Sequence, residues 1–192
     1  MKRLVSFMLL VVSVFSLAYS QNEPMSKNPP LNNLSDTLRA EGNLQIMLSL
    51  VEKAGFSNLG LKPNGSSGLT DTSKASEYTF FAPDDAAFAK LAPGVLEKLK
   101  QDETKLRQFL SGHAVPKKLM IADMLIPVER TPGKTLLETV NLNGEKVSIL
   151  CNEHPGEHRP LINGLARIGK ADILFANGVV HKIDQLLLNP FQ

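Results

Sequence analysis

The sequence predicts an α+β fold, with helices in the N-terminal half of the domain and β-hairpins in the C-terminal half. Two observations support this. Up to Pro116, apolar residues recur at helical spacing behind helix-capping residues. In the last third of the chain, three Asn-Gly pairs are each flanked by apolar segments rich in β-branched residues, a pattern typical of tight hairpin turns. A length of 192 residues fits one domain of ordinary size.

The N-terminus has the layout of a secretory signal. Lys2 and Arg3 precede the apolar run 4–17, and the small residues Ala18 and Ser20 follow it. We therefore expect a signal peptide over residues 1–20, export to the periplasm or the medium, a disordered leader over residues 21–33, and a single domain over residues 34–192. The apolar run is shorter than the roughly 20 residues that a membrane-spanning helix needs, so no transmembrane segment is expected.

Two short helices are expected where the domain begins. The first starts near Ser35, with Ser35 or Asp36 as its cap, and Asn43 is the expected cap of the second. Five apolar residues of the second helix fall on one face and predict its buried side: Leu44, Met47, Leu48, Val51 and Ala54. Gly55 is the expected stop signal, and Ser57 to Ser76, rich in Gly, Ser, Thr and Asn, is expected to be a long exposed loop.

The next elements alternate a buried strand with helices. Tyr78 to Ala82 has the residues of a buried strand that ends at Pro83, and Asp84 or Asp85 is the expected cap of a helix after it. Asp102 opens a further helix that must stop before Pro116, and a short apolar helix is expected from about Met120 to Leu125.

The three Asn-Gly pairs organise the last third of the chain. They are Asn143-Gly144, Asn163-Gly164 and Asn177-Gly178. Asn-Gly suits the type I′ turn, in which both central residues have positive φ. The sequence therefore predicts an antiparallel meander of hairpins from Thr139 to Leu188.

Three segments in this order resemble a known family. The segment Tyr78 to Leu91 (YTFFAPDDAAFAKL) is similar to the first signature block of the fasciclin domain, and Ala171 to Asp184 (ADILFANGVVHKID) is similar to the second. Phe109 to Pro116 stands where the family has a Tyr-His segment, although Gly112 replaces the Tyr. The resemblance implies helices packed on a twisted antiparallel β-sandwich or wedge, with the two signature blocks paired at its centre.

The resemblance also implies a function. Fasciclin domains act in cell adhesion and in attachment to matrix or surfaces, and some bind small ligands. His113, Asp172 and Ile173 are the candidate binding residues that the resemblance carries over. The leading hypothesis is a secreted adhesion or binding module without catalytic turnover, whose partner is a cell-surface or matrix protein or polysaccharide. The alternative is a carrier of an apolar small molecule such as a carotenoid, which absorbance and mass spectrometry of the native protein would reveal.

Composition and motifs argue against other classes of function. The formal charge of +2, which includes the signal residues Lys2 and Arg3, gives no support to nucleic-acid binding. Cys151, the single cysteine, stands in an apolar segment, and no Gly-x-Ser-x-Gly motif occurs. A metal-dependent hydrolase built on His154 and His158 is the least favoured reading, because the intervening Pro-Gly makes a helix improbable. No catalytic residue, metal ligand or cofactor is predicted.

Two histidines and four phenylalanines are assigned to the interior. His113 and His181 lie among apolar residues, so we expect partly buried imidazoles with hydrogen-bond partners. The residues expected in the core are Phe80, Phe81, Phe88 and Phe109.

Overall fold

The computed structural model describes residues 33–57, 77–124, 136–150 and 160–188. Contacts divide the chain into two units, Met1–Pro30 and Leu31–Gln192, and all described residues belong to the second. The expected signal peptide, all of the leader except Asn33, and loop residues 58–76 lie outside the described residues. Within the described part of the chain, no helix has the length and apolar character needed to cross a membrane.

The secondary structure is of mixed type. The helices are α2 (Leu34–Ala40), α3 (Gln45–Lys53), α4 (Asp85–Phe88), α5 (Val95–Gln101) and α6 (Glu103–Gly112). Residues 121–124 are also helical, as expected. Sheet A contains β1 (Tyr78–Pro83), β2 (Ala114–Val115), β7 (Ile173–Phe175) and β8 (Gly178–Ile183), in the order β2-β1-β8-β7. Sheet B contains β3 (Leu136–Val140), β4 (Lys146–Leu150), β5 (Leu161–Ile162) and β6 (Ala166–Arg167), in the order β3-β4-β5-β6.

The centre of sheet A is a parallel pair formed by β1 and β8. Tyr78 lies opposite Gly178, and Pro83 lies opposite Ile183. A Cβ atom on Gly178 would lie 1.9 Å from the carbonyl oxygen of Tyr78, so only glycine permits this approach. The predicted central pairing of the two signature blocks is therefore confirmed, and so is the α+β fold class.

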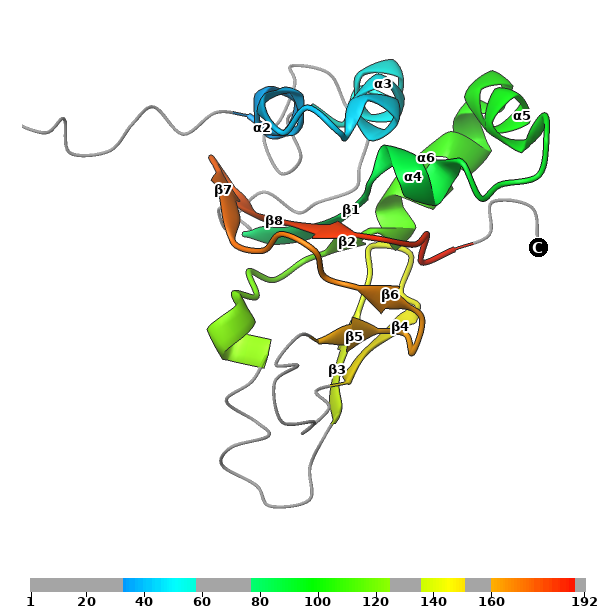
Figure 1. Ribbon diagram of the computed structural model, residues 1–192. Helices are drawn as coiled ribbons and strands as arrows, with labels where there is room; N and C mark the ends of the chain where they lie inside the picture. The colour runs from blue at the N-terminus through cyan, green and yellow to red at the C-terminus, as the bar shows by residue number, and fades with distance from the viewer. Residues whose placement is uncertain (1–32, 58–76, 125–135, 151–159, 189–192) are drawn as a thin grey trace, which may run out of the picture. The chain divides into compact units, whose positions relative to one another are not determined.

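Sheet A lies between the helices α2–α6 and sheet B (Figure 1). It separates two apolar clusters. Because side chains alternate along a strand, Phe80 of β1 packs in the cluster under the helices, whereas Phe81 packs in the cluster between the two sheets. All four phenylalanines assigned to the core are buried. The hydroxyl of Tyr78 is also buried, and within the described structure it has no hydrogen-bond partner.

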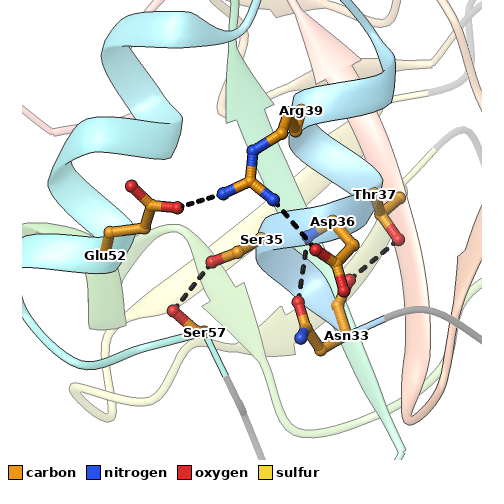
Figure 2. A network of polar contacts seen from close by, with 7 residues as sticks. All are labelled: Asn33, Ser35, Asp36, Thr37, Arg39, Glu52 and Ser57. Atoms are coloured by element: carbon orange, nitrogen blue, oxygen red, sulfur yellow. Dashed lines mark hydrogen bonds and ion pairs between the residues drawn. The ribbon is translucent and has the colours of Figure 1, made fainter.

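The first helix is capped differently from the prediction. The side chain of Asn33 accepts a hydrogen bond from the backbone N–H of Asp36, so Asn33 is the N-cap of α2 and the expected caps, Ser35 and Asp36, are wrong (Figure 2). Ser35 is buried and its hydroxyl donates instead to the hydroxyl of Ser57, 2.7 Å away. Arg39 joins the two helices by ion pairs with Asp36 in α2 and Glu52 in α3.

The second helix takes its cap from a distant element. The structure places Leu44, not Asn43, at the N-cap of α3, and that residue makes no capping hydrogen bond from its side chain. The carboxylate of Asp85, at the start of α4, accepts from the backbone N–H groups of Gln45 and Ile46. The prediction of Asn43 is wrong because a tertiary contact replaces the local cap. The buried face of α3 and the stop at Gly55, whose φ is +70°, are as expected.

The later helices begin where the sequence indicates. The carboxylates of Asp84 and Asp102 cap α4 and α6 through the backbone N–H groups of Ala87 and Lys105. α5 was not predicted as a separate helix. It starts after Gly94, whose φ is +80°, and buries only Leu99.

The prediction of one meander from Thr139 to Leu188 is wrong. The three Asn-Gly pairs do join antiparallel hairpins, but β3–β4 and β5–β6 belong to sheet B, whereas β7–β8 belongs to sheet A. The first of these strands also begins earlier, at Leu136. Only Asn163 and Gly164 both have positive φ, which a type I′ turn requires. Gly178 is instead the first residue of β8.

Candidate interaction site

His113 follows α6, and its imidazole is fully buried. The Nε2 atom accepts a hydrogen bond of 3.1 Å from the backbone N–H of Leu187. Nδ1 therefore carries the proton and donates to the carbonyl of Phe109, 2.9 Å away. Burial lowers the pKa of His113 to about 4, against a smaller opposing effect of the Phe109 carbonyl. The neutral imidazole thus ties the end of α6 to the C-terminal segment.

His181 lies in β8, is also fully buried, and uses the opposite tautomer. Its Nδ1 accepts from the backbone N–H of Asp172 at 3.3 Å, so Nε2 donates to the carbonyl of Leu119 at 2.7 Å. Burial lowers the pKa of His181, while the Leu119 carbonyl and the Asp172 charge act in the opposite direction. Because the ring is neutral, its 4.0 Å contact with the Asp172 carboxylate is not an ion pair. Both histidines are hydrogen-bonded, as expected. They are fully buried, whereas the sequence suggests partly buried imidazoles.

Asp172 precedes β7 in a left-handed backbone conformation, with φ of +56°. Its Oδ1 accepts a hydrogen bond of 3.0 Å from the backbone N–H of Ile121, at the start of the helical residues 121–124. Together with the bond from its own N–H to His181, this contact fixes the carboxylate in place, although 37% of the side chain remains exposed. Asp172 is therefore a rigidly held surface anion.

The exposed apolar group of this region is Leu174, which the sequence analysis did not single out. β7 is an edge strand of sheet A, and its side chains alternate. Ile173 is partly buried and packs against the cluster under the helices, whereas Leu174 is 50% exposed. Strand alternation could have identified Leu174. Because it follows the inward-facing Ile173 in a strand, its side chain points to the opposite face of the sheet. The surface formed by Asp172 and Leu174 is called the β7 surface below.

The structure does not bring the three predicted residues together. Asp172 and Ile173 lie at the β7 edge of sheet A, whereas His113 immediately precedes β2, at the opposite edge. His113 has no exposed surface. Of the three predicted residues, Asp172 is therefore the most accessible to a macromolecule, and it is the one that belongs to the β7 surface.

Gly112, which stands in place of the Tyr of the Tyr-His pattern, lies against the side chain of Leu188. A Cβ atom at Gly112 would lie 1.9 Å from Cδ1 of Leu188. The C-terminal segment therefore occupies the space that a larger side chain at position 112 would need.

The remaining candidate residues are not in the described structure. His154, His158 and Cys151 lie outside the described residues. In the residues that the structure does describe, no cluster of three or more His, Cys, Asp or Glu side chains is suited to hold a metal ion. His113 and His181 have both ring nitrogens bonded to backbone groups, so neither nitrogen is free to exchange a proton with a substrate.

A family model described as "Fasciclin domain" matches residues 42–189. The chain belongs to the fasciclin-domain family. Among solved structures, it is similar to a FAS1 domain pair from the insect cell adhesion molecule Fasciclin I, with a TM-score of 0.57 and 19% identity over 80% of this chain and 47% of the other. That likeness confirms the fold.

The curated relatives cover the chain to different extents. Periostin of Homo sapiens is 34% identical over 58% of this chain, and the transforming growth factor-beta-induced protein ig-h3 of Sus scrofa is 28% identical over 82%. This fasciclin chain spans only 12% and 19% of those two proteins. The immunogenic protein MPB70 of Mycobacterium bovis is 26% identical over 86% of this chain and 66% of its own length.

Proposed function

We propose that this fasciclin domain is a secreted adhesion or matrix-interaction module that binds a cell-surface or matrix protein or polysaccharide without catalytic turnover. The N-terminal signal pattern supports export. Two similar proteins support the surface location and the activity by their names: the cell surface glycolipoprotein MPB83, which is 26% identical over 91% of this chain, and the insect cell adhesion molecule Fasciclin I.

The observation that carries the proposal is the composition and rigidity of the β7 surface. Leu174 is 50% exposed, and it lies two residues after Asp172, whose side chain is 37% exposed. The hydrogen bonds of Asp172 to Ile121 and His181 hold that surface in place before any partner arrives. A pre-organised surface loses less conformational freedom on binding, which favours affinity. His113, being buried, would contribute only by positioning the segments around it.

The test compares two equivalent leucines. Surfaces coated with the full chain would be offered to cells of the source organism, and attached cells counted. Leu174→Ser should weaken attachment about tenfold, the effect of losing one half-buried leucine contact. Leu165→Ser is the matched control, because Leu165 is 57% exposed at the turn between β5 and β6.

A third variant measures how much the negative charge of Asp172 contributes to attachment. Asp172→Asn keeps an oxygen that can accept from Ile121 but removes the anion. If the partner is cationic, this variant should attach less well and lose the salt dependence of attachment. Equal attachment of Leu174→Ser, Leu165→Ser and the unmodified chain would contradict the assignment of the β7 surface.

A further inference from the structure

The outer edge of β3 has no partner strand in the described structure. β3 is the first strand of sheet B and pairs only with β4. The outer edges of β2 and β6 are covered. The backbone N–H of Leu142 donates to the carbonyl of Ala114 in β2, and that of Arg167 in β6 donates to the Asp184 carboxylate. β3 has five residues and β7 has three, so β3 is the longer of the two remaining edges.

The hydrogen-bond pattern shows which groups point outward. In an antiparallel pair, hydrogen-bonded and non-hydrogen-bonded positions alternate. The backbone N–H of Asn141 donates to Glu145, so the alternation leaves Leu136, Glu138 and Val140 at non-hydrogen-bonded positions. Their N–H and C=O groups therefore point away from β4.

Ser148 gives an independent check of this pattern. It lies opposite Glu138, and its own N–H and C=O bond to Asn163, toward β5 and away from β3. The outer edge of β3 thus presents three donor and acceptor sets in a row to an incoming strand.

The side chains at the same three positions share the outer face of sheet B. Val140 is 50% exposed and Leu136 is partly exposed. Between them, the Glu138 side chain is 47% exposed, and its Oε1 lies 2.5 Å from Nζ of Lys146. The side chains along this edge are therefore apolar, acidic and apolar, and the acidic one already has Lys146 as an ion-pair partner.

We propose that the outer edge of β3 is a second interaction surface, which binds an extended segment of a partner protein as an added antiparallel strand. Backbone bonds to Leu136, Glu138 and Val140 hold the segment. Specificity comes from alternate residues of the partner: aliphatic side chains opposite Leu136 and Val140, and an Arg or Lys opposite Glu138.

A second copy of this chain is a poorer occupant. The antiparallel register that uses all three outward-facing residues of both copies places Glu138 opposite Glu138. Like charges directly opposite each other destabilise a strand pair. A heterologous segment with a central cation avoids this repulsion.

The test uses a synthetic capped peptide, Thr-Val-Thr-Arg-Thr-Val-Thr, added to the isotope-labelled full chain. We expect the amide signals of Leu136, Glu138 and Val140 to shift on titration. N-methylation of the two Val residues and the Arg removes the N–H groups that face β3 and should abolish binding. N-methylation of the Thr residues on either side of the Arg should leave it, because those N–H groups face away.

Two substitutions of Glu138 separate the contribution of its backbone N–H to binding from that of its carboxylate charge. Glu138→Pro removes an outward N–H that β3 does not use in its own sheet, and should weaken binding about tenfold. Glu138→Gln keeps the N–H and should weaken binding less while reducing its salt dependence. Should Glu138→Pro fail to fold, the two N-methylated peptides provide the same comparison on the unmodified chain.

Binding that is equal for both N-methylated peptides, or that shifts the amide signals of β7 rather than β3, would overturn the proposal. This surface is independent of the β7 surface. Leu174→Ser should leave peptide binding unchanged, and Glu138→Pro should leave cell attachment through β7 unchanged, so failure of either proposal is visible separately.

Discussion

Acid should destabilise this domain through the buried His113. In the folded state Nε2 accepts from the Leu187 N–H, and burial lowers the pKa from 6.5 to about 4. As pH falls below 6.5, the unfolded chain takes up a proton at His113 that the folded domain does not, so stability falls. The loss begins near pH 6.5, is complete near pH 4, and is absent above pH 7.

The size of the effect follows from the pKa difference. One pKa unit corresponds to about 1.4 kcal/mol, so acidification from pH 7 to pH 4.5 should remove about 2 to 3 kcal/mol of unfolding free energy through His113 alone. That is a large part of the roughly 5 to 15 kcal/mol that stabilises an ordinary domain.

Urea unfolding followed by circular dichroism at pH 7 and pH 4.5 would measure the loss. Carboxylates also titrate over this range, so the informative quantity is the difference between the unmodified chain and His113→Gln, which cannot titrate at that position. We expect the unmodified chain to lose about 2 to 3 kcal/mol more than the variant between the two pH values. Equal losses would show that His113 has the same pKa in both states, and would refute the reasoning.

Five further substitutions, one of them a control, test the packing by urea unfolding at pH 7. Gly178→Ala should prevent the β1–β8 pairing because of the contact with the Tyr78 carbonyl, whereas Gly169→Ala, with no atom closer than 3.5 Å to the added Cβ, should be near neutral; equal effects would contradict the clash. Asp85→Ala should cost about 1 to 2 kcal/mol by uncapping α3, and no loss would refute the tertiary cap. Phe81→Ala should cost about 3 to 5 kcal/mol, and a much smaller loss would contradict its place in the core. Tyr78→Phe should be neutral or stabilising by up to about 1 kcal/mol, because it removes a buried hydroxyl without a partner in the described structure; a clear loss would reveal one.

Local patterns predicted the features that depend on neighbouring residues. The caps Asp84 and Asp102 act within one helical turn, and the apolar face of α3 follows from helical periodicity. The cap of α3 could not be predicted in this way, because Asp85 lies about 40 residues further along the chain. A sequence pattern reports spacing along the chain but not such distant contacts.

The candidate site also combines features that local sequence predicts with features that only the three-dimensional contacts reveal. The resemblance identified Asp172 and Ile173, but only the structure shows that Ile173 turns inward and that Leu174 is the exposed neighbour. His113 accepts a hydrogen bond from Leu187, 74 residues further along the chain, which a local pattern does not reveal. The meander was mispredicted for a related reason, because Asn-Gly indicates a hairpin but not the sheet to which that hairpin belongs.

The parallel pairing of β1 with β8 constrains when the domain can fold. Tyr78 must find Gly178, and both apolar clusters use residues of β8: Val180 in one and Ile183 in the other. Neither layer can therefore be completed on a nascent chain until β8 has left the ribosome. Closing so long a loop before its contacts form also predicts slow folding.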